Sequence, residues 1–453
     1  MKRINQDLTT GNITTKLWLF ALPFMLGNVL QQFYHLCDTW IVAKYIGDDA
    51  LAAVGSSYTL MNFFTSVILG LCLGSGAFFA ITFGQKQWAR LRNGIFLSFT
   101  FIALLSFGLT LAAFWLVDEI IEWLQTPAAI TTMTRDYLVN VFWGLMAIFI
   151  YHYFANLLRS IGNSLLPLLF LAISVIANIG LDILFVAVYE TGVPGAAIAT
   201  VIAQYLSAIG LMVYALLAYP QLRPQRSDRV WRRNEMQEIL SLSGYTCLQQ
   251  SVMNFGILMV QGIVNSFGTA VMSAFAVAVK IDTIAYMPVQ DFGNAFSTLI
   301  AQNYGAGKWD RIHRGIRTSL VNVTLFCCLI SALVWIFAEP LMGIFIDESQ
   351  VEMIHIGAQY LRIEGFFYIG IGILFMLYGY FRAIQRPQVS LVLTAISLGT
   401  RVLLAYWLSR ISFIGVIGIW AAIPIGWLLA DLYGMIVYWR GNRSTEGQKL
   451  QES

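Results

Sequence analysis

Charged side chains are scarce in this sequence of 453 residues: only 11% are Asp, Glu, Lys or Arg, whereas 58% are hydrophobic. A soluble domain needs far more polar side chains to cover its surface, so this composition excludes a soluble globular protein. The short alternating strands that a transmembrane barrel requires are also absent. A bundle of membrane-spanning helices is therefore the expected architecture.

The apolar residues fall into long blocks that exceed the ~20 residues a helix needs to cross a hydrocarbon core. These blocks lie at 17–43, 50–82, 94–117, 137–158, 163–188, 194–219, 240–267, 270–302, 316–338, 353–381, 388–409 and 413–439. They predict an all-α membrane protein of twelve transmembrane helices. Several blocks are longer than an upright span, so tilt, kinks or extensions beyond the membrane are expected.

Motifs for ATP-driven work or catalysis are missing as well. Gly307-Lys308 is followed by Trp309 and lacks the upstream glycine of a Walker A motif. The four histidines have no metal-binding spacing, and the five cysteines all lie in apolar blocks, where disulfides are not expected. No potassium-filter sequence and no nucleophile–base constellation is evident. We expect no enzymatic activity, no cofactor, no resident metal and no nucleic-acid partner, so any transport must draw on an ion gradient.

The few charges alternate along the chain. Lys and Arg gather at the N-terminus, on the even-numbered connections and on the C-terminal tail, whereas Asp and Glu occupy the odd-numbered connections. The positive-inside rule then places both termini in the cytoplasm. The first apolar block is too long for a signal-peptide core, and no small-residue cleavage site follows it. A multi-pass protein of a bacterial-type inner membrane is expected.

The two halves of the chain repeat each other. Matches at an offset of 221 are Gly47 with Gly268, Gly84 with Gly305, Trp88 with Trp309 and Arg90 with Arg311. Matches at an offset of 223 are Tyr137 with Tyr360, Arg159 with Arg382 and Ser174 with Ser397. Each half holds six blocks, so the repeats are parallel and related by an axis along the membrane normal. We predict an N-lobe at 1–219, a cytoplasmic linker at 220–235, a C-lobe at 236–440 and a cytoplasmic tail at 441–453.

Polar residues inside the first lobe are the main functional signal, because ionisable groups in a membrane are costly. Asp38, Asp182 and Thr200 lie inside apolar blocks, and Asn178 is one helical turn before Asp182. Their repeat counterparts carry other chemistry, namely Gly256 or Met259, Ala405, Ile423 and Arg401. Two carboxyls in low dielectric can exchange protons, and the same oxygens suit Na⁺. The alternative is a purely structural set of hydrogen bonds between helices.

Pro23 lies in the first block, fifteen residues before Asp38. A proline removes a helical hydrogen bond and permits a kink. Many membrane helices tolerate proline without switching, so a hinge and a static kink both stay open.

The second lobe has its own charges, which suggest a cavity. Lys280, Met287 and Asp291 share one face of the block at 270–302, whereas Asp282 points elsewhere and Glu364 lies in the block at 353–381. Lys280 looks deeply buried and needs an acidic partner among Asp282, Asp291 and Glu364. A structural ion pair between helices and a cavity-lining role are both consistent with this pattern.

These features resemble the multidrug and toxic compound extrusion (MATE) family over residues 12 to 440. The residues that carry the resemblance are Ala21-Leu22-Pro23, the run from Asp38-Thr39 to Gly47, Ala50 to Gly55, Gln302-Asn303-Tyr304-Gly305-Ala306-Gly307 and Arg382-Ala383. The resemblance implies a V-shaped bundle of two lobes. It also matches Asp38, Asn178, Asp182 and Thr200 to the ion-coupling site of the DinF-like branch, where bending at the proline matched by Pro23 has been proposed.

One departure from the family pattern distinguishes coupling to H⁺ from coupling to Na⁺. The sodium-driven branch carries an acid in the seventh helix, but this chain has none between Glu238 and Lys280. The resemblance therefore implies a monomeric antiporter that exports organic cations or amphipathic drugs in exchange for H⁺, with Na⁺ as the second choice. The alternatives are a lipid-linked oligosaccharide flippase of the same superfamily, which needs a strongly cationic cavity, and an intramembrane enzyme.

Overall fold

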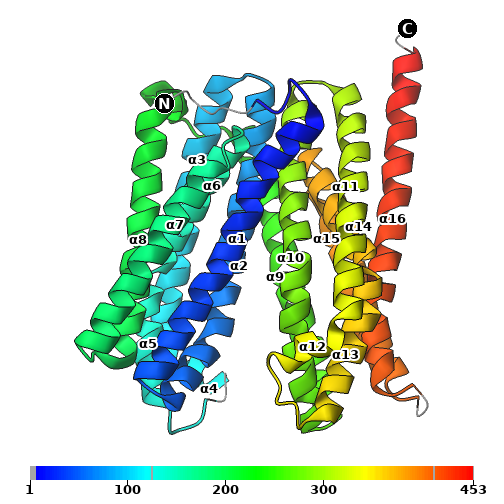
Figure 1. Cartoon of the computed structure of the whole chain (residues 1–453). Coiled ribbons are helices and arrows are strands. Elements are labelled where there is room, and N and C mark those ends of the chain that lie inside the picture. The colour runs from blue at the N-terminus through cyan, green and yellow to red at the C-terminus, as the bar shows by residue number, and fades with distance from the viewer. Residues whose placement is uncertain (1–6, 124–125, 412–413, 452–453) are drawn as a thin grey trace. The chain divides into compact units, whose positions relative to one another are not determined.

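The computed structural model describes residues 7–123, 126–411 and 414–451, and within these residues it contains helices and no strand (Figure 1). The first half comprises α1 (Ile13–Tyr45), α2 (Asp48–Gly84), α3 (Trp88–Trp115), α4 (Val117–Trp123), α5 (Thr131–Phe142), α6 (Leu145–Ser160), α7 (Leu165–Asp182), the π-helical turn η1 (Ile183–Val188) and α8 (Gly192–Ala218). The 3₁₀ turns η2 (Pro220–Leu222) and η3 (Arg226–Asp228) follow. The second half comprises α9 (Arg233–Asn265), α10 (Thr269–Gly305), α11 (Trp309–Ile336), α12 (Ala338–Gly343), α13 (Val351–Phe366), α14 (Tyr368–Ala383), α15 (Pro387–Leu408) and α16 (Val416–Gln451).

Ten described helices are long and apolar enough to cross a membrane, and two bent pairs bring the total to twelve spans. The pair α5 and α6 bends by 43°, and the pair α13 and α14 bends by 53°. Each of the twelve apolar blocks coincides with one of these spans, so the predicted all-α fold is confirmed. The two breaks fall at equivalent places in the repeat, since Gly144 plus 223 is Phe367.

The chain divides into two compact units. Unit 1 holds the residues up to Leu248 together with Ala301–Trp309, and unit 2 holds Gln249–Ile300 and the residues from Asp310 onward. The beginning of α9 and the end of α10 therefore pack in unit 1. The lobe boundaries proposed from the sequence at residue 219 and residue 236 stay a prediction.

The ends of α2 and α10 meet in unit 1 through a reciprocal pair of glycines. A Cβ atom on Gly84 would lie 2.1 Å from the carbonyl oxygen of Gln302, and one on Gly305 would lie 2.0 Å from the carbonyl oxygen of Ile81. Gly305 and Gln302 are the repeat counterparts of Gly84 and Ile81 at the offset of 221. The same contact is thus made twice, and only glycine permits the two backbones to approach this closely.

The side-chain amides of Gln302 and Asn303 form hydrogen bonds with backbone groups next to this contact. The Gln302 amide donates to the carbonyl oxygen of Ser160 at 2.7 Å, and its Oε1 accepts from the backbone N–H of Leu8 at 3.1 Å. The Asn303 amide donates to the carbonyl oxygen of Leu8 at 3.2 Å. The Gln-Asn pair of the motif at 302–307 therefore holds the segment before α1 against the ends of α6 and α10.

The linker between α8 and α9 is mostly exposed, but around Asp228 it forms hydrogen bonds with side chains of α3. Arg92 donates to the Asp228 carboxylate at 2.6 Å, and the Asn93 amide donates to the carbonyl oxygens of Asp228 and Val230 at 2.6 and 2.7 Å. Burial by itself would raise the pKa of the Asp228 carboxyl. The hydrogen bonds from Arg92 and from the backbone N–H of Gln225 outweigh burial, so this pKa lies below its ordinary value.

We expect Asp228→Asn to loosen the linker, because the substitution removes a charge-assisted hydrogen bond that favours the packed state. A carboxyl with a lowered pKa contributes stability at neutral pH and loses it only as the pH falls through that pKa. Tryptic cleavage at the linker arginines should accelerate by about tenfold at neutral pH. The control is Asp347→Asn in the loop between α12 and α13. Equal rates of linker cleavage in Asp228→Asn and the parent protein would show that the Arg92–Asp228 contact does not hold the linker in place.

Candidate functional site

Unit 1 brings the four predicted coupling residues into one buried cluster. Asp38 comes from α1, Asn178 and Asp182 from α7, and Thr200 from α8. Their exposed fractions are 6%, 0%, 0% and 6%, and the Asn178 amide lies 3.5 Å from the Thr200 hydroxyl. Asp38 is close enough to act electrostatically on Asp182. Residues from three helices, distant in the sequence, thus form one polar cluster in an apolar surrounding.

The cluster has more acceptors than donors. Oδ1 of Asp38, Oδ1 of Asn178 and both carboxyl oxygens of Asp182 have no hydrogen-bond partner among the described residues. Buried polar atoms are nearly always satisfied in folded proteins, so such a concentration calls for an explanation. Acceptors without donors suit an added proton or a small cation bound by oxygen ligands.

Two tyrosines complete the cluster, and sequence reasoning missed both. Tyr34 on α1 has a buried hydroxyl without a hydrogen-bond partner among the described residues, and Tyr137 on α5 is 7% exposed. Both lie within electrostatic reach of Asp38 and Asp182. The signal for Tyr34 was its spacing, because residues four apart on a helix share a face.

Asp182 occupies an unusual backbone position. It is the last residue of α7, and the π-helical turn η1 begins directly after it. π-Helical turns are rare and are frequent at functional sites, because they shift the side chains around them out of the regular helical register. Apolar periodicity alone does not reveal this turn, since the residues that follow Asp182, from Ile183 to Val188, are all hydrophobic.

Helix α1 continues through Pro23 as one element from Ile13 to Tyr45. Pro288 and Pro424 likewise lie inside α10 and α16. Bending of α1 at Pro23 during function stays a prediction.

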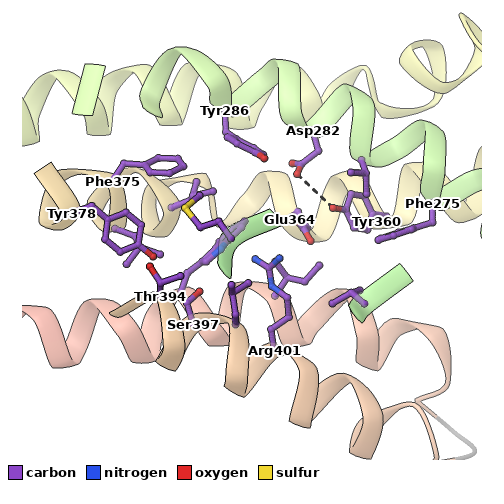
Figure 2. Close-up of a pocket in the computed structure, with 18 residues that line it drawn as sticks. Phe275, Asp282, Tyr286, Tyr360, Glu364, Phe375, Tyr378, Thr394, Ser397 and Arg401 are labelled. Atoms are coloured by element: carbon purple, nitrogen blue, oxygen red, sulfur yellow. Dashed lines mark hydrogen bonds between the residues drawn. The ribbon is translucent and has the colours of Figure 1, made fainter. Parts of the chain in front are cut away.

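Unit 2 contains a pocket of about 80 Å³ between α9, α10 and α13 to α16. Asp282 and Glu364, two of the predicted cavity residues, line this pocket (Figure 2). The Asp282 carboxylate accepts hydrogen bonds from the hydroxyls of Tyr368 at 2.7 Å and Tyr360 at 3.5 Å. The two acids lie within hydrogen-bonding reach of each other.

The other predicted cavity residues on α10 lie outside the pocket lining. Asp291 is 1% exposed and Met287 is partly buried, but neither lines the pocket. The expected deep burial of Lys280 is wrong, because its side chain is exposed. Lys280 precedes Asp282 by two residues, so about 200° of helical rotation separates them. Among the described residues Lys280 forms no ion pair.

The cation that faces the two acids is Arg401 on α15, which lines the pocket. Sequence reasoning placed Arg401 at the repeat position of Asn178 but did not assign it to the cavity. It also overlooked Asp431 on α16, which is 2% exposed and has one carboxyl oxygen without a partner among the described residues. The sequence signal that identified Asp38 also applies to Asp431, because each is a lone acid in an apolar block.

Comparisons with known proteins agree with this architecture. The MatE family profile matches residues 23–184 and again residues 246–407. The two matches start 223 residues apart (246 − 23), which confirms the internal repeat. A solved structure described as MATE in the bent conformation superposes with a TM-score of 0.91 at 20% identity, covering 100% of both chains.

Two curated bacterial relatives align over most of their length. The probable multidrug resistance protein YpnP of Bacillus subtilis is 31% identical over 91% of this chain and 90% of its own length. The probable multidrug resistance protein NorM of Thermotoga maritima is 24% identical over 90% of this chain and 88% of its own length. The chain therefore belongs to the MatE family and is a MATE-family efflux transporter.

Proposed function

We propose that this transporter is a secondary antiporter that exports amphipathic, often cationic organic compounds in exchange for H⁺, with Na⁺ as the alternative ion. The observation that carries the proposal is the unit 1 cluster, where Asp38 and Asp182 present buried carboxyl oxygens without donors. Support for the substrate class comes from relatives named as multidrug resistance proteins.

Two neighbouring carboxylates in a low-dielectric site repel each other and lose hydration, so the doubly charged cluster is unfavourable. Binding of a proton or of Na⁺ neutralises part of that charge. An ion that binds one conformation more tightly than another shifts the equilibrium between them. We propose that loading of Asp38 and Asp182 biases the transporter toward one orientation in an alternating-access cycle.

We further propose that the protein works as a monomer in a bacterial inner membrane, with both termini in the cytoplasm. The excess of Lys and Arg on even-numbered connections supports this orientation. A flippase for lipid-linked pyrophosphates is disfavoured, because a cationic cavity is needed and Arg401 shares its pocket with Asp282 and Glu364.

The decisive experiment loads reconstituted vesicles with ethidium and imposes a proton gradient and a sodium gradient separately. Ethidium movement driven by the proton gradient alone is the expected result. Movement driven only by the sodium gradient would replace H⁺ with Na⁺ as the coupling ion. If neither gradient drives ethidium while lipid-linked precursors are translocated, the export proposal is wrong.

A further inference from the structure

The unit 2 pocket has an acidic pole. Asp282 is 4% exposed and Glu364 is 1% exposed, and both lie on the pocket wall. Tyrosine hydroxyls satisfy Asp282, but Oε1 of Glu364 has no hydrogen-bond partner among the described residues. A buried carboxyl oxygen without a donor is costly, so at this pole Oε1 of Glu364 lacks a hydrogen-bond donor.

The opposite pole of the pocket is cationic. Figure 2 shows the Arg401 side chain pointing toward Glu364 and Asp282 from the other side of the pocket. Arg401 is close enough to act electrostatically on both acids, yet among the described residues it forms no ion pair within 4.0 Å. Its Nε also lacks a hydrogen-bond partner in the described part of the chain. A donor and an acceptor therefore face the same cavity across a gap.

The unit 2 pocket and the unit 1 cluster occupy equivalent places in the two repeats but differ in charge. At the offset of 223, Tyr137 of the unit 1 cluster corresponds to Tyr360 of the pocket, and Asn178 corresponds to Arg401. The pocket is thus the repeat counterpart of the unit 1 cluster. Unit 1 combines two acids with a neutral amide, whereas unit 2 combines two acids with a guanidinium. An added cation neutralises the first arrangement, but the second already holds a cation.

The remaining walls of the pocket are largely aromatic and aliphatic. Tyr286, Phe375 and Trp427 line it, and the Arg401 guanidinium carbon lies 5.9 Å from the centre of the Trp427 ring. Such walls bind the apolar body of a ligand, while a few convergent polar groups fix its head. A cavity of about 80 Å³ holds several water molecules. The polar gap therefore has room for a small charged head group.

We propose that this pocket binds amphipathic zwitterions, with the ligand ammonium at Glu364 and Asp282 and the ligand carboxylate at Arg401. A zwitterion supplies both missing partners at once, whereas a simple cation leaves Arg401 unsatisfied and a simple anion leaves Glu364 unsatisfied. Arg401 is accordingly the residue that sets the charge specificity of the pocket. Zwitterion binding at Arg401 is independent of the coupling role proposed for Asp38.

Three matched fluorescent probes test the charge specificity. Nε-dansyl-lysine is a zwitterion, dansylcadaverine is the same chain without the carboxylate, and dansylaminohexanoate lacks the ammonium. Binding to the full-length protein in nanodiscs is measured from dansyl fluorescence, with empty nanodiscs subtracted. We expect dansyl-lysine to bind about tenfold more tightly than either of the other probes, since each charged hydrogen bond contributes at least that factor.

Substitutions then assign the two poles. Arg401→Asn, which installs the residue of the other repeat, should remove the preference for dansyl-lysine over dansylcadaverine, and Arg401→Lys should keep part of it. Glu364→Gln should weaken both amine-bearing probes by a similar factor and leave dansylaminohexanoate unchanged. An unchanged ratio of dansyl-lysine to dansylcadaverine affinity in Arg401→Asn overturns the proposal, as does the absence of a preference in the parent protein.

Asp38→Asn separates this proposal from the proposed antiport function. That variant should lose gradient-driven export and keep the preference for dansyl-lysine. If Asp38→Asn abolishes the preference and Arg401→Asn does not, the zwitterion binds in unit 1 and the assignment to the unit 2 pocket is wrong.

Discussion

Asp38→Asn is expected to reduce gradient-driven export of ethidium by about tenfold or more, because an amide neither releases a proton nor carries the charge that binds Na⁺. Asparagine has nearly the same shape as aspartate, so the packing of α1 against α7 should survive. The measurement is initial ethidium flux in reconstituted vesicles, normalised to the amount of folded transporter. Asp182→Asn should behave similarly, since the two carboxyls lie in one cluster and act on each other.

A matched control comes from the other unit. Asp431→Asn also removes a buried intramembrane carboxyl, but from α16 and outside the unit 1 cluster. Export should persist in this variant if the effect of Asp38→Asn reflects ion coupling rather than the loss of any buried acid. Normal export by Asp38→Asn under both gradients would rule out a coupling role for Asp38.

Gly305→Ala is expected to destabilise the transporter by about 1–3 kcal/mol, because the added methyl group overpacks a contact between two backbones. The new Cβ would lie 2.0 Å from the carbonyl oxygen of Ile81, and neither backbone can move without disturbing its helix. Gly84→Ala should have a similar effect, since its Cβ would lie 2.1 Å from the carbonyl oxygen of Gln302. The unfolding temperatures of both variants are measured by heating samples and then quantifying the remaining folded protein by fluorescence-detected gel filtration.

Gly108→Ala on α3 provides the matched control, because a Cβ there meets nothing within 4 Å. This substitution should leave stability unchanged or raise it slightly, since alanine favours helix more than glycine does. If Gly84→Ala, Gly305→Ala and Gly108→Ala all unfold at the same temperature as the parent protein, the close approach of α2 and α10 is not a source of stability.

The breaks within two spans show where sequence patterns lose information. The blocks at 137–158 and 353–381 are predominantly apolar and contain no proline, so each is predicted as one span. The structure bends them at Gly144 and at Phe367. A helix can break wherever its freed backbone groups find partners, and those partners come from packing rather than from hydropathy. The π-helical turn after Asp182 is hidden for the same reason.

The charged residues on α10 show that helical periodicity does not predict burial. The spacing of Lys280, Met287 and Asp291 places them on one helix face, but this face is buried at Asp291 and exposed at Lys280. Helical periodicity gives direction around an axis and says nothing about what packs there at each level. The pocket acids are instead Asp282 and Glu364, and the cation opposite them is Arg401 on α15, a helix distant in the sequence.

Residue type and order by themselves determined three things about this protein. Low charge with long apolar blocks required membrane helices, the offset of 221 to 223 required two repeats, and lone acids in apolar blocks marked Asp38 and Asp182. Only the tertiary structure decided which polar groups meet. It joined Asp38, Asp182 and Thr200 in unit 1 and set Arg401 against Glu364 in unit 2, because contacts between helices depend on packing that no single helix encodes.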